Sequence, residues 1–202
     1  MSDLIRLDEV DGRGRYELLT SLVVPRPIGW VSTRSKEGVL NLAPFSFFGA
    51  VSASPMLLSL SIGTRKGVAK DSLQNIRERG EFCVNVVTEP QLEQMNMTAG
   101  EYPPDVDEFA CAGLPVAEAV TVDAPYIASC PAVFECRTHR DIDLAPGVSL
   151  IVAEALAVRI DGSLDVVEGT RFVDSRSLRP VARLSGAAYA LLGEIKELER
   201  PG

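Results

Sequence analysis

Residues 148–160 read VSLIVAEALAVRI. Every even-numbered position in this run is apolar except Glu154, so apolar side chains recur with the period of two that is typical of a β-strand. Shorter alternating runs lie at residues 58–62 and 82–86, and further strand candidates lie at residues 27–33, 45–52, 132–137 and 181–184. About seven short strands with few helices predict a mainly β protein, folded as a barrel or a sandwich.

Helical patterns are few and short. Residues 68–79 carry apolar side chains on one face and are followed by Gly80, where a helix C-terminus is expected. Residues 16–22 are a weaker candidate, and a third helix is expected to open at Thr88. No linker separates these segments, so we expect a single domain over residues 1–202.

Composition and charge exclude several classes of protein. A net charge of −8 and a pI of about 4.8 leave no basic face for nucleic acid and no polybasic patch for a membrane surface. The N-terminal residues lack the pattern of a signal peptide, and residues 148–160 are too few and too polar to span a bilayer. The four cysteines form no CxxC pattern and are expected to be small buried side chains. We therefore expect a cytoplasmic protein without nucleic-acid or membrane partners.

Several kinds of catalytic site are also excluded. His139 is the only histidine, so a multi-histidine zinc site is excluded and no metal site is expected. The motifs GxSxG, GxxxxGK and GxGxxG are absent. A Ser-His-Asp triad that uses His139 stays open, but no neighbouring feature supports it, and a histidine on the surface or in a loop is favoured.

Residues 25–33 read PRPIGWVST. Two prolines fix the backbone at the entry to a strand, and the only tryptophan, Trp30, lies on that strand. A tryptophan in the core is favoured, while contact with a ligand stays open. Ser32 and Thr33 end the strand with hydroxyl groups that either cap a turn or bind a ligand.

Residues 41–48 read NLAPFSFF and combine an amide, a turn proline and a hydroxyl group with an aromatic run. A planar, amide-rich ring such as that of a flavin needs hydrogen bonds along its edge and apolar contact on its faces. This segment offers both. The alternative is a turn into an aromatic core strand.

Arg65, Lys66 and Lys70 lie within six positions, ahead of a predicted helix. Free N–H groups at a helix start attract anions, and neighbouring cations add charge-assisted hydrogen bonds. Cations at a helix N-terminus are otherwise mildly unfavourable. The pattern therefore favours a phosphate site, such as one for FMN, over a solvated loop.

Taken together and in this order, PRPIGWVST, NLAPFSFF and RKGVAKDSLQNIRERGEFCVNVV (residues 65–87) resemble the flavin reductase-like, FMN-binding split-barrel family. The resemblance continues through FACAGL, PAVFEC and RLSGAAY, and it covers roughly residues 15–190. PRPIGWVST is closest to the flavoredoxin-like members. The resemblance implies a mainly β fold, a six-stranded antiparallel split barrel of Greek-key type with a few peripheral helices. It also implies a homodimer with FMN at the subunit interface, and NAD(P)H or a redox protein as candidate electron donor.

Carried over residue by residue, the resemblance also implies a set of cofactor-binding positions. They are Ser32 and Thr33 near the flavin, Asn41, Leu42, Ala43 and Ser46 at the ring edge and ribityl chain, Ser61, Ile62 and Gly63 at the flavin or ribityl chain, and Arg65, Lys66, Lys70 and Ser72 around the phosphate. Asp71 and Asn75 are expected to hold the phosphate loop rather than to touch the ligand.

One departure from the family affects the activity. Many NAD(P)H:flavin reductases of this family carry Gly-Asp-His where this chain has APGVSL at residues 145–150. The missing histidine counts against direct reduction of the flavin by a nicotinamide. The function expected first is therefore an FMN-binding oxidoreductase or electron-transfer protein. The alternatives are an NAD(P)H-dependent flavin reductase component of a two-component monooxygenase and a non-catalytic ligand-binding barrel.

Overall fold

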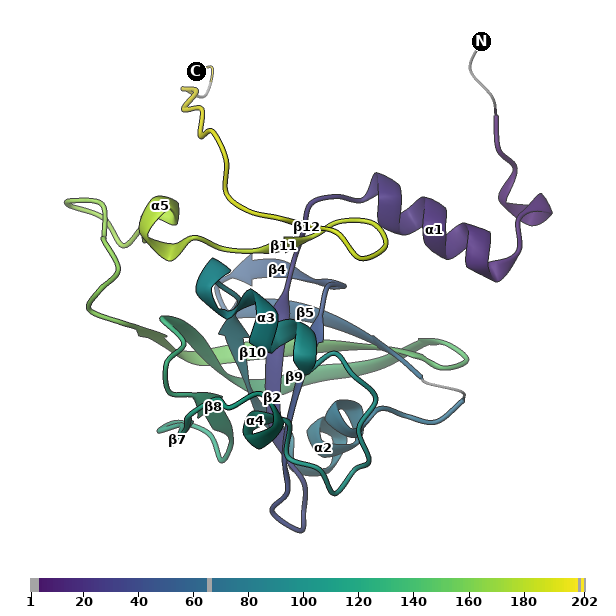
Figure 1. The fold of residues 1–202 in the computed structure, drawn as a ribbon, viewed down its shortest axis with the longest axis horizontal. Helices are drawn as coiled ribbons and strands as arrows, with labels where there is room; N and C mark the ends of the chain where they lie inside the picture. The colour runs from purple at the N-terminus through teal and green to yellow at the C-terminus, as the bar shows by residue number, and fades with distance from the viewer. Residues whose placement is uncertain (1–3, 65–66, 200, 202) are drawn as a thin grey trace.

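The computed structural model describes residues 4–64, 67–199 and 201. Its main sheet has seven strands in the order β3-β2-β6-β9-β10-β5-β4, and every neighbouring pair is antiparallel (Figure 1). These strands are β2 (Gly29–Arg34), β3 (Leu40–Phe45), β4 (Phe48–Ala53), β5 (Met56–Gly63), β6 (Glu81–Val86), β9 (Ala132–Ala145) and β10 (Val148–Ile160). The mainly β, antiparallel fold expected from the sequence is confirmed.

The two edge strands of the main sheet, β3 and β4, are consecutive in the chain. Only Ser46 and Phe47 separate them, so the sheet must curl until its two edges approach each other, which makes a split barrel. The strand predicted over residues 45–52 is present as β4 from Phe48 onward, but it does not include Ser46 and Phe47, where the chain leaves one edge of the sheet and joins the other. The main sheet has seven strands, one more than the resemblance implies.

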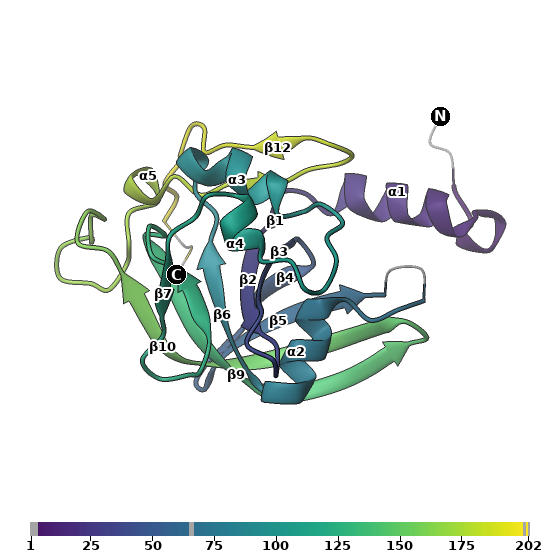
Figure 2. The ribbon, with the colours of Figure 1, turned by 60° about the horizontal axis from the view of Figure 1, so that its bottom comes forward.

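Two small sheets complete the β-structure. One pairs β7 (Val116–Glu118) with β8 (Pro125–Ile127), and the other joins β1 (Arg26–Pro27) to β11 (Ala182–Arg183) and β12 (Tyr189–Ala190). We call residues 179–192, which carry β11 and β12, the C-terminal strap. The strap passes over the end of the barrel opposite to α2 in both views (Figures 1 and 2).

The helices are short and lie outside the barrel. They are α1 (Gly12–Leu22), α2 (Asp71–Arg79), α3 (Leu92–Met97), α4 (Glu108–Cys111) and α5 (Ser175–Leu178), with 3-10 turns at Leu7–Glu9 and Glu89–Gln91. The three predicted helices are present, although α2 starts at Asp71 rather than at Val68 because Lys70 is its N-cap. Gly80 ends α2 with a φ of 72°, as its place in the sequence predicts. Helix α1 extends away from the sheet (Figure 1).

The long strand predicted at residues 148–160 is present as β10 with the same bounds. Its buried side chains are Ser149, Ile151 and Ala153, which occupy odd-numbered positions. The apolar side chains at even-numbered positions face outward, and Leu156, Val158 and Ile160 are 38%, 40% and 47% exposed. The alternation predicted the strand correctly, but its more apolar face lies on the outside.

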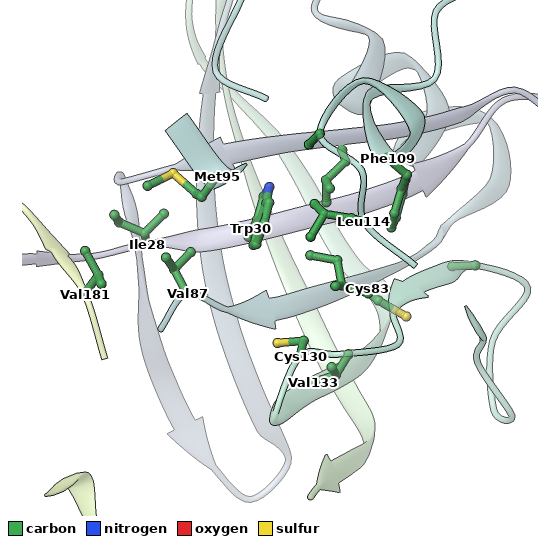
Figure 3. Packing of buried hydrophobic residues seen from close by; sticks show 14 of the residues in the cluster. Ile28, Trp30, Cys83, Val87, Met95, Phe109, Leu114, Cys130, Val133 and Val181 are labelled. Atoms are coloured by element: carbon green, nitrogen blue, oxygen red, sulfur yellow. The ribbon is translucent and has the colours of Figure 1, made fainter. Parts of the chain in front are cut away.

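Trp30 lies in the core and is fully buried. It packs in one hydrophobic cluster with Met95 on one side and Leu114 on the other (Figure 3). Its indole Nε1 donates a hydrogen bond of 2.8 Å to Thr98 Oγ1. Of the two positions left open by the sequence, the structure gives the core position. No helix among the described residues combines the length and the apolar character that a membrane span requires.

Candidate functional site

Two adjoining cavities meet at the C-terminal end of β3. The first, the helix cavity, has a volume of about 360 Å³ and lies between β3, the start of α2 and residues 98–108. The second, the strap cavity, has a volume of about 510 Å³ and is bordered by β5, α3 and the C-terminal strap. Both cavities are lined by Pro44, Phe45, Lys70 and Ala99. Volumes of roughly 300–1,000 Å³ are typical of small-molecule and cofactor sites.

Lys70 stands at the junction of the two cavities. It is the N-cap residue of α2, and its Nζ lies 5.2 Å from the centroid of the Phe45 ring. A lysine side chain carries no acceptor, so it cannot cap the first N–H groups of the helix. The helix start therefore presents positive charge and N–H donors together, as anion sites in proteins do.

A network of buried side chains links the start of α2 to β2, β3 and α4. Asn41 is its centre, and its Oδ1 accepts hydrogen bonds from Ser72 Oγ at 2.6 Å and from Thr33 Oγ1 at 3.2 Å. Thr33 Oγ1 in turn accepts a bond of 3.0 Å from Asn75 Nδ2. The other end of the Asn41 amide donates to Glu108 Oε1 at 2.9 Å. Each member is buried and bonded, so the network fixes the position of Ser72 at the wall of the helix cavity.

Glu108 is the carboxylate of this network and is only 6% exposed. Its Oε2 accepts a hydrogen bond of 3.0 Å from the backbone N–H of Leu42. Burial raises the pKa of this carboxyl above its ordinary value of 4.5, while the hydrogen bonds from Leu42 and Asn41 act in the opposite direction. The described residues that line the helix cavity therefore include two acidic side chains, Asp71 and Glu108, and one cation, Lys70.

The strap cavity has a different charge. Its described lining residues include the cations Lys70 and Arg183 and no carboxylate. The Arg183 guanidinium carbon lies 4.5 Å from the centroid of the Tyr189 ring, and the Tyr189 hydroxyl donates to Asn96 Oδ1 at 2.9 Å. The strap thus contributes an aromatic wall and a cation to a cavity that β3 and β5 begin.

The turn between β9 and β10 contacts Thr64, one of the residues that line the strap cavity. Gly147 has a φ of 75°, and its carbonyl oxygen accepts a hydrogen bond of 2.8 Å from the backbone N–H of Thr64. Thr64 lines the strap cavity together with Gly63. This turn lies in residues 145–150, the segment without the histidine expected from the family resemblance. In this structure its hydrogen bond to Thr64 holds the chain that follows β5.

The structure brings many of the predicted cofactor-binding residues together. Those that line one of the two cavities are Asn41, Ala43, Ser46, Ser61, Gly63, Lys70 and Ser72. Arg65 and Lys66 lie outside the described residues. The remaining four line neither cavity; they are Ser32, Thr33, Leu42 and Ile62.

The side chains of these four residues face the interior. Ser32 Oγ donates to the carbonyl oxygen of Pro125 at 2.7 Å and accepts a bond from Asn85. Leu42 and Ile62 are fully buried in the hydrophobic clusters. These side chains therefore lie behind the cavity walls, and the Ser32 and Thr33 hydroxyl groups donate internal hydrogen bonds.

Sequence reasoning missed part of the cavity walls. These wall residues were assigned no role at the site: Thr98, Ala99, Gly100, Tyr102, Glu108, Arg183 and Tyr189. Arg183 and Tyr189 belong to the quoted motif RLSGAAY, which was the one available signal. Arg183 and Tyr189 lie more than 100 positions after residues 41–72 in the sequence. They come close to the site only because the strap pairs with β1 through β11 and β12.

Histidine and cysteine side chains take no part in the two cavities. His139 is exposed on β9, which confirms the surface position favoured from the sequence. Cys83, Cys130 and Cys136 are buried as predicted, whereas the prediction was wrong for Cys111, which is exposed. Burial raises the pKa of Cys130 to about 11 and that of Cys136 to about 12, so both thiols stay protonated near neutral pH.

Comparison with known proteins identifies the family. The model of the flavin reductase like domain matches residues 21–171. An uncharacterized protein of Aquifex aeolicus is 40% identical over 190 residues, which cover 93% of this chain and 95% of that protein. The structure of nitrilotriacetate monooxygenase component B from Bacillus cereus is 32% identical, with a TM-score of 0.94, and the match covers 98% of this chain and 99% of that chain.

The structure of the 2-nitrobenzoate 2-nitroreductase NbaA from Pseudomonas fluorescens is 29% identical, with a TM-score of 0.90, over 98% of this chain and 96% of that chain. The motifs quoted from the sequence, the split barrel and these matches agree over most of the chain. The chain therefore belongs to the flavin reductase-like family of split-barrel proteins.

Proposed function

We propose that the protein is an FMN-dependent oxidoreductase or electron-transfer protein that holds FMN in the joined helix and strap cavities. The observation that carries the proposal is the position of Lys70, a cation at a helix start that lies between two cavities and beside the ring of Phe45. Family membership supports a flavin as the ligand. The proposal treats the chain as one domain in the cytoplasm, a location that the four free cysteines favour.

The residues at the start of α2 fit the phosphate of FMN. Lys70 supplies a charge and the first turn of the helix supplies its N–H groups. The Ser72 hydroxyl donates its proton to Asn41 Oδ1, so it fixes this turn rather than donating to the phosphate. Asp71 and Glu108 place negative charge in the helix cavity. The phosphate is therefore best placed at Lys70 and the first N–H groups of α2, away from these two carboxylates.

The walls between the cavities fit the flavin ring. Ala43, Pro44 and Phe45 offer apolar and aromatic surface, and Ser46 and Ser61 offer hydroxyl groups for the ring edge or ribityl chain. When bound, FMN supplies the redox chemistry. The chain's own residues orient the ring, exclude water from its apolar side and hold the phosphate by charge.

A nicotinamide-dependent flavin reductase is the second candidate. The observation that favours it is the similarity over nearly the whole chain to a structure whose name is component B of a monooxygenase. The absence of the family histidine at residues 145–150 counts against it. A non-catalytic barrel is a weaker third candidate, because the described residues expected around the phosphate line the cavities.

We further propose that the protein is a homodimer with FMN at the subunit interface. Leu156, Val158 and Ile160 give β10 an outward apolar face, and α1 exposes Leu19 and Leu22. Exposed apolar side chains gathered on one face of a strand are typical of an interface. A second copy of the chain is the occupant that the family resemblance implies for these surfaces.

The test is titration of the flavin-free protein with FMN, FAD and riboflavin, followed by anaerobic mixing of the loaded protein with NADH and NADPH. We expect FMN to bind most tightly. Bleaching of the flavin by either nucleotide would favour the reductase, and bleaching only by dithionite or a protein donor would favour the electron carrier. A protein that binds none of the three flavins would refute the proposal.

A further inference from the structure

The strap cavity is positively charged in a protein of net charge −8. Among the described residues that line it, Lys70 and Arg183 are cations and none is an acid. A third cation lies just behind the wall, because the buried Arg26 places its Nε 3.5 Å from Ser46 Oγ. The Arg26 guanidinium donates to the backbone carbonyl oxygens of residues 20, 23 and 184 and forms no ion pair with a described residue. Cations gathered in a concave site raise the local concentration of anionic ligands.

The Arg183 side chain is held in place without a charge partner. Its guanidinium lies against the Tyr189 ring, and Nη2 donates to the carbonyl oxygen of Gly186. No carboxylate of the described residues forms an ion pair with it, in contrast to Arg179 on the same strap, which pairs with Glu89 at 2.7 Å. A guanidinium has five N–H donors, so most of those of Arg183 stay available in the cavity. Stacking on the Tyr189 ring also restricts the orientation of the planar Arg183 guanidinium before any ligand binds.

The two cations of the strap cavity come from opposite sides. Lys70 precedes α2, whereas Arg183 belongs to the C-terminal strap, and α2 and the strap lie toward opposite ends of the barrel in both views (Figures 1 and 2). In the proposed function, the phosphate of FMN engages Lys70. FMN carries no second phosphate for Arg183. Among the described lining residues no acid pairs with this second cation, so its guanidinium stays available for a further anionic group.

We propose that Arg183, supported by Tyr189, is a recognition site for the anionic group of a small molecule that binds in the strap cavity beside the flavin. The inference rests on the proposed function for the place of the flavin. A planar guanidinium matches a carboxylate or a phosphate by paired hydrogen bonds. Ile28, Phe47 and Met95 add apolar surface to the same cavity, so the ligand class is a small molecule with an apolar body and one carboxylate or phosphate group.

The test compares ligands that differ only in charge. Benzoate, phenyl phosphate and neutral benzamide are titrated into the FMN-loaded protein by isothermal calorimetry. We expect benzoate or phenyl phosphate to bind about tenfold more tightly than benzamide, as a charged hydrogen-bonded pair predicts. The tighter of the two anions distinguishes a carboxylate from a phosphate ligand.

Variants assign the preference to Arg183. Arg183→Gln should bring the ratio of anion to benzamide affinity close to one, and Arg183→Lys should restore part of it. Arg140→Gln is the matched control, because Arg140 is exposed on β9 and its side chain hydrogen-bonds only to the carbonyl oxygen of His139 among the described residues. Both affinities in the ratio are measured on the same variant, so a general loss of stability would lower both and leave the ratio unchanged.

Three outcomes would overturn the inference: equal affinities for anions and benzamide in the unchanged protein, a preference that survives Arg183→Gln, or a loss of all three ligands that Arg183→Lys does not reverse. Failure of the proposed function is recognised separately by FMN titration. A benzoate preference in a protein that takes up no flavin would keep the anion site and refute only the flavin function.

Discussion

The carboxylate of Glu108 accepts a hydrogen bond of 2.9 Å from the side-chain amide of Asn41, although the two residues lie 67 positions apart. This bond orients the amide so that its oxygen faces Ser72 at the start of α2. Glu108 lines the helix cavity and, through Asn41, also fixes the position of Ser72 in the wall of that cavity. It is therefore a positioning residue for the proposed cofactor site, and the neighbouring contacts allow this role to be tested.

Glu108→Gln preserves the shape of the side chain but replaces one of the two acceptor oxygens, which face the Leu42 N–H and the Asn41 NH₂, with an NH₂ group. One donor then loses its acceptor in a buried place. We expect a loss of about 1–3 kcal/mol in the free energy of unfolding and a weaker affinity for FMN. Urea denaturation and flavin titration measure both. Glu93→Gln, on the exposed side of α3, should change stability by less than about 0.5 kcal/mol.

The same residue predicts a pH dependence. Because burial raises the pKa of Glu108, the folded state binds its proton more tightly than the unfolded state does. The stability that this proton contributes is fully present below the unfolded pKa and is lost as the pH rises through the folded pKa. The unfolding free energy of the unchanged protein, relative to Glu108→Gln, should therefore fall as the pH rises above 4.5. A difference that grows with pH would show that the folded pKa is lowered.

Lys70→Gln tests the charge at the junction of the cavities. Removal of the ammonium should weaken binding of FMN about tenfold and leave riboflavin unaffected, because riboflavin has no phosphate. Fluorescence titration with the two flavins gives the ratio. Lys36→Gln serves as control, since Lys36 is exposed and pairs with Glu78 far from the cavities. Equal weakening of both flavins would place the phosphate elsewhere.

Gly147→Ala tests the support that the β9–β10 turn gives to Thr64. A Cβ at Gly147 would lie 2.7 Å from Thr64 Oγ1, on a residue whose φ is +75°. We expect a loss of about 1–2 kcal/mol in stability from the backbone conformation alone, and weaker flavin binding from the displaced Thr64. Gly162→Ala is the matched control, because a Cβ there meets no atom within 4 Å. Unchanged thermal unfolding in Gly147→Ala would contradict the argument.

Leu156→Glu tests the outward face of β10. A carboxylate on this face should be tolerated by the folded chain, because the side chain is 38% exposed, but it should convert a dimer into a monomer. Sedimentation velocity separates the two states, and FMN affinity should fall with the dimer. Val167→Glu, at a residue that is 49% exposed outside this face, should leave the dimer intact. A Leu156→Glu protein that stays dimeric would require another interface.

Local sequence determined several elements of this protein by itself. The alternation in residues 148–160 gave β10 its bounds, Gly80 ended α2, and the proline and amide of residues 41–48 marked one wall of the site. These features depend on backbone preference and on side-chain period, which act over a few residues and can be read directly. The quoted motifs also predicted the split-barrel family correctly.

The tertiary structure alone decided which face of each strand is buried and which distant residues meet. β10 buries its odd-numbered side chains because β5 and β9 pair with it in a curled sheet, and alternation cannot say which side of a strand faces the interior. Glu108 reaches Asn41, and Arg183 reaches the strap cavity, only after the chain has closed its barrel and folded its C-terminal strap over the end. Such contacts depend on the closure of long loops, for which short-range sequence carries no signal.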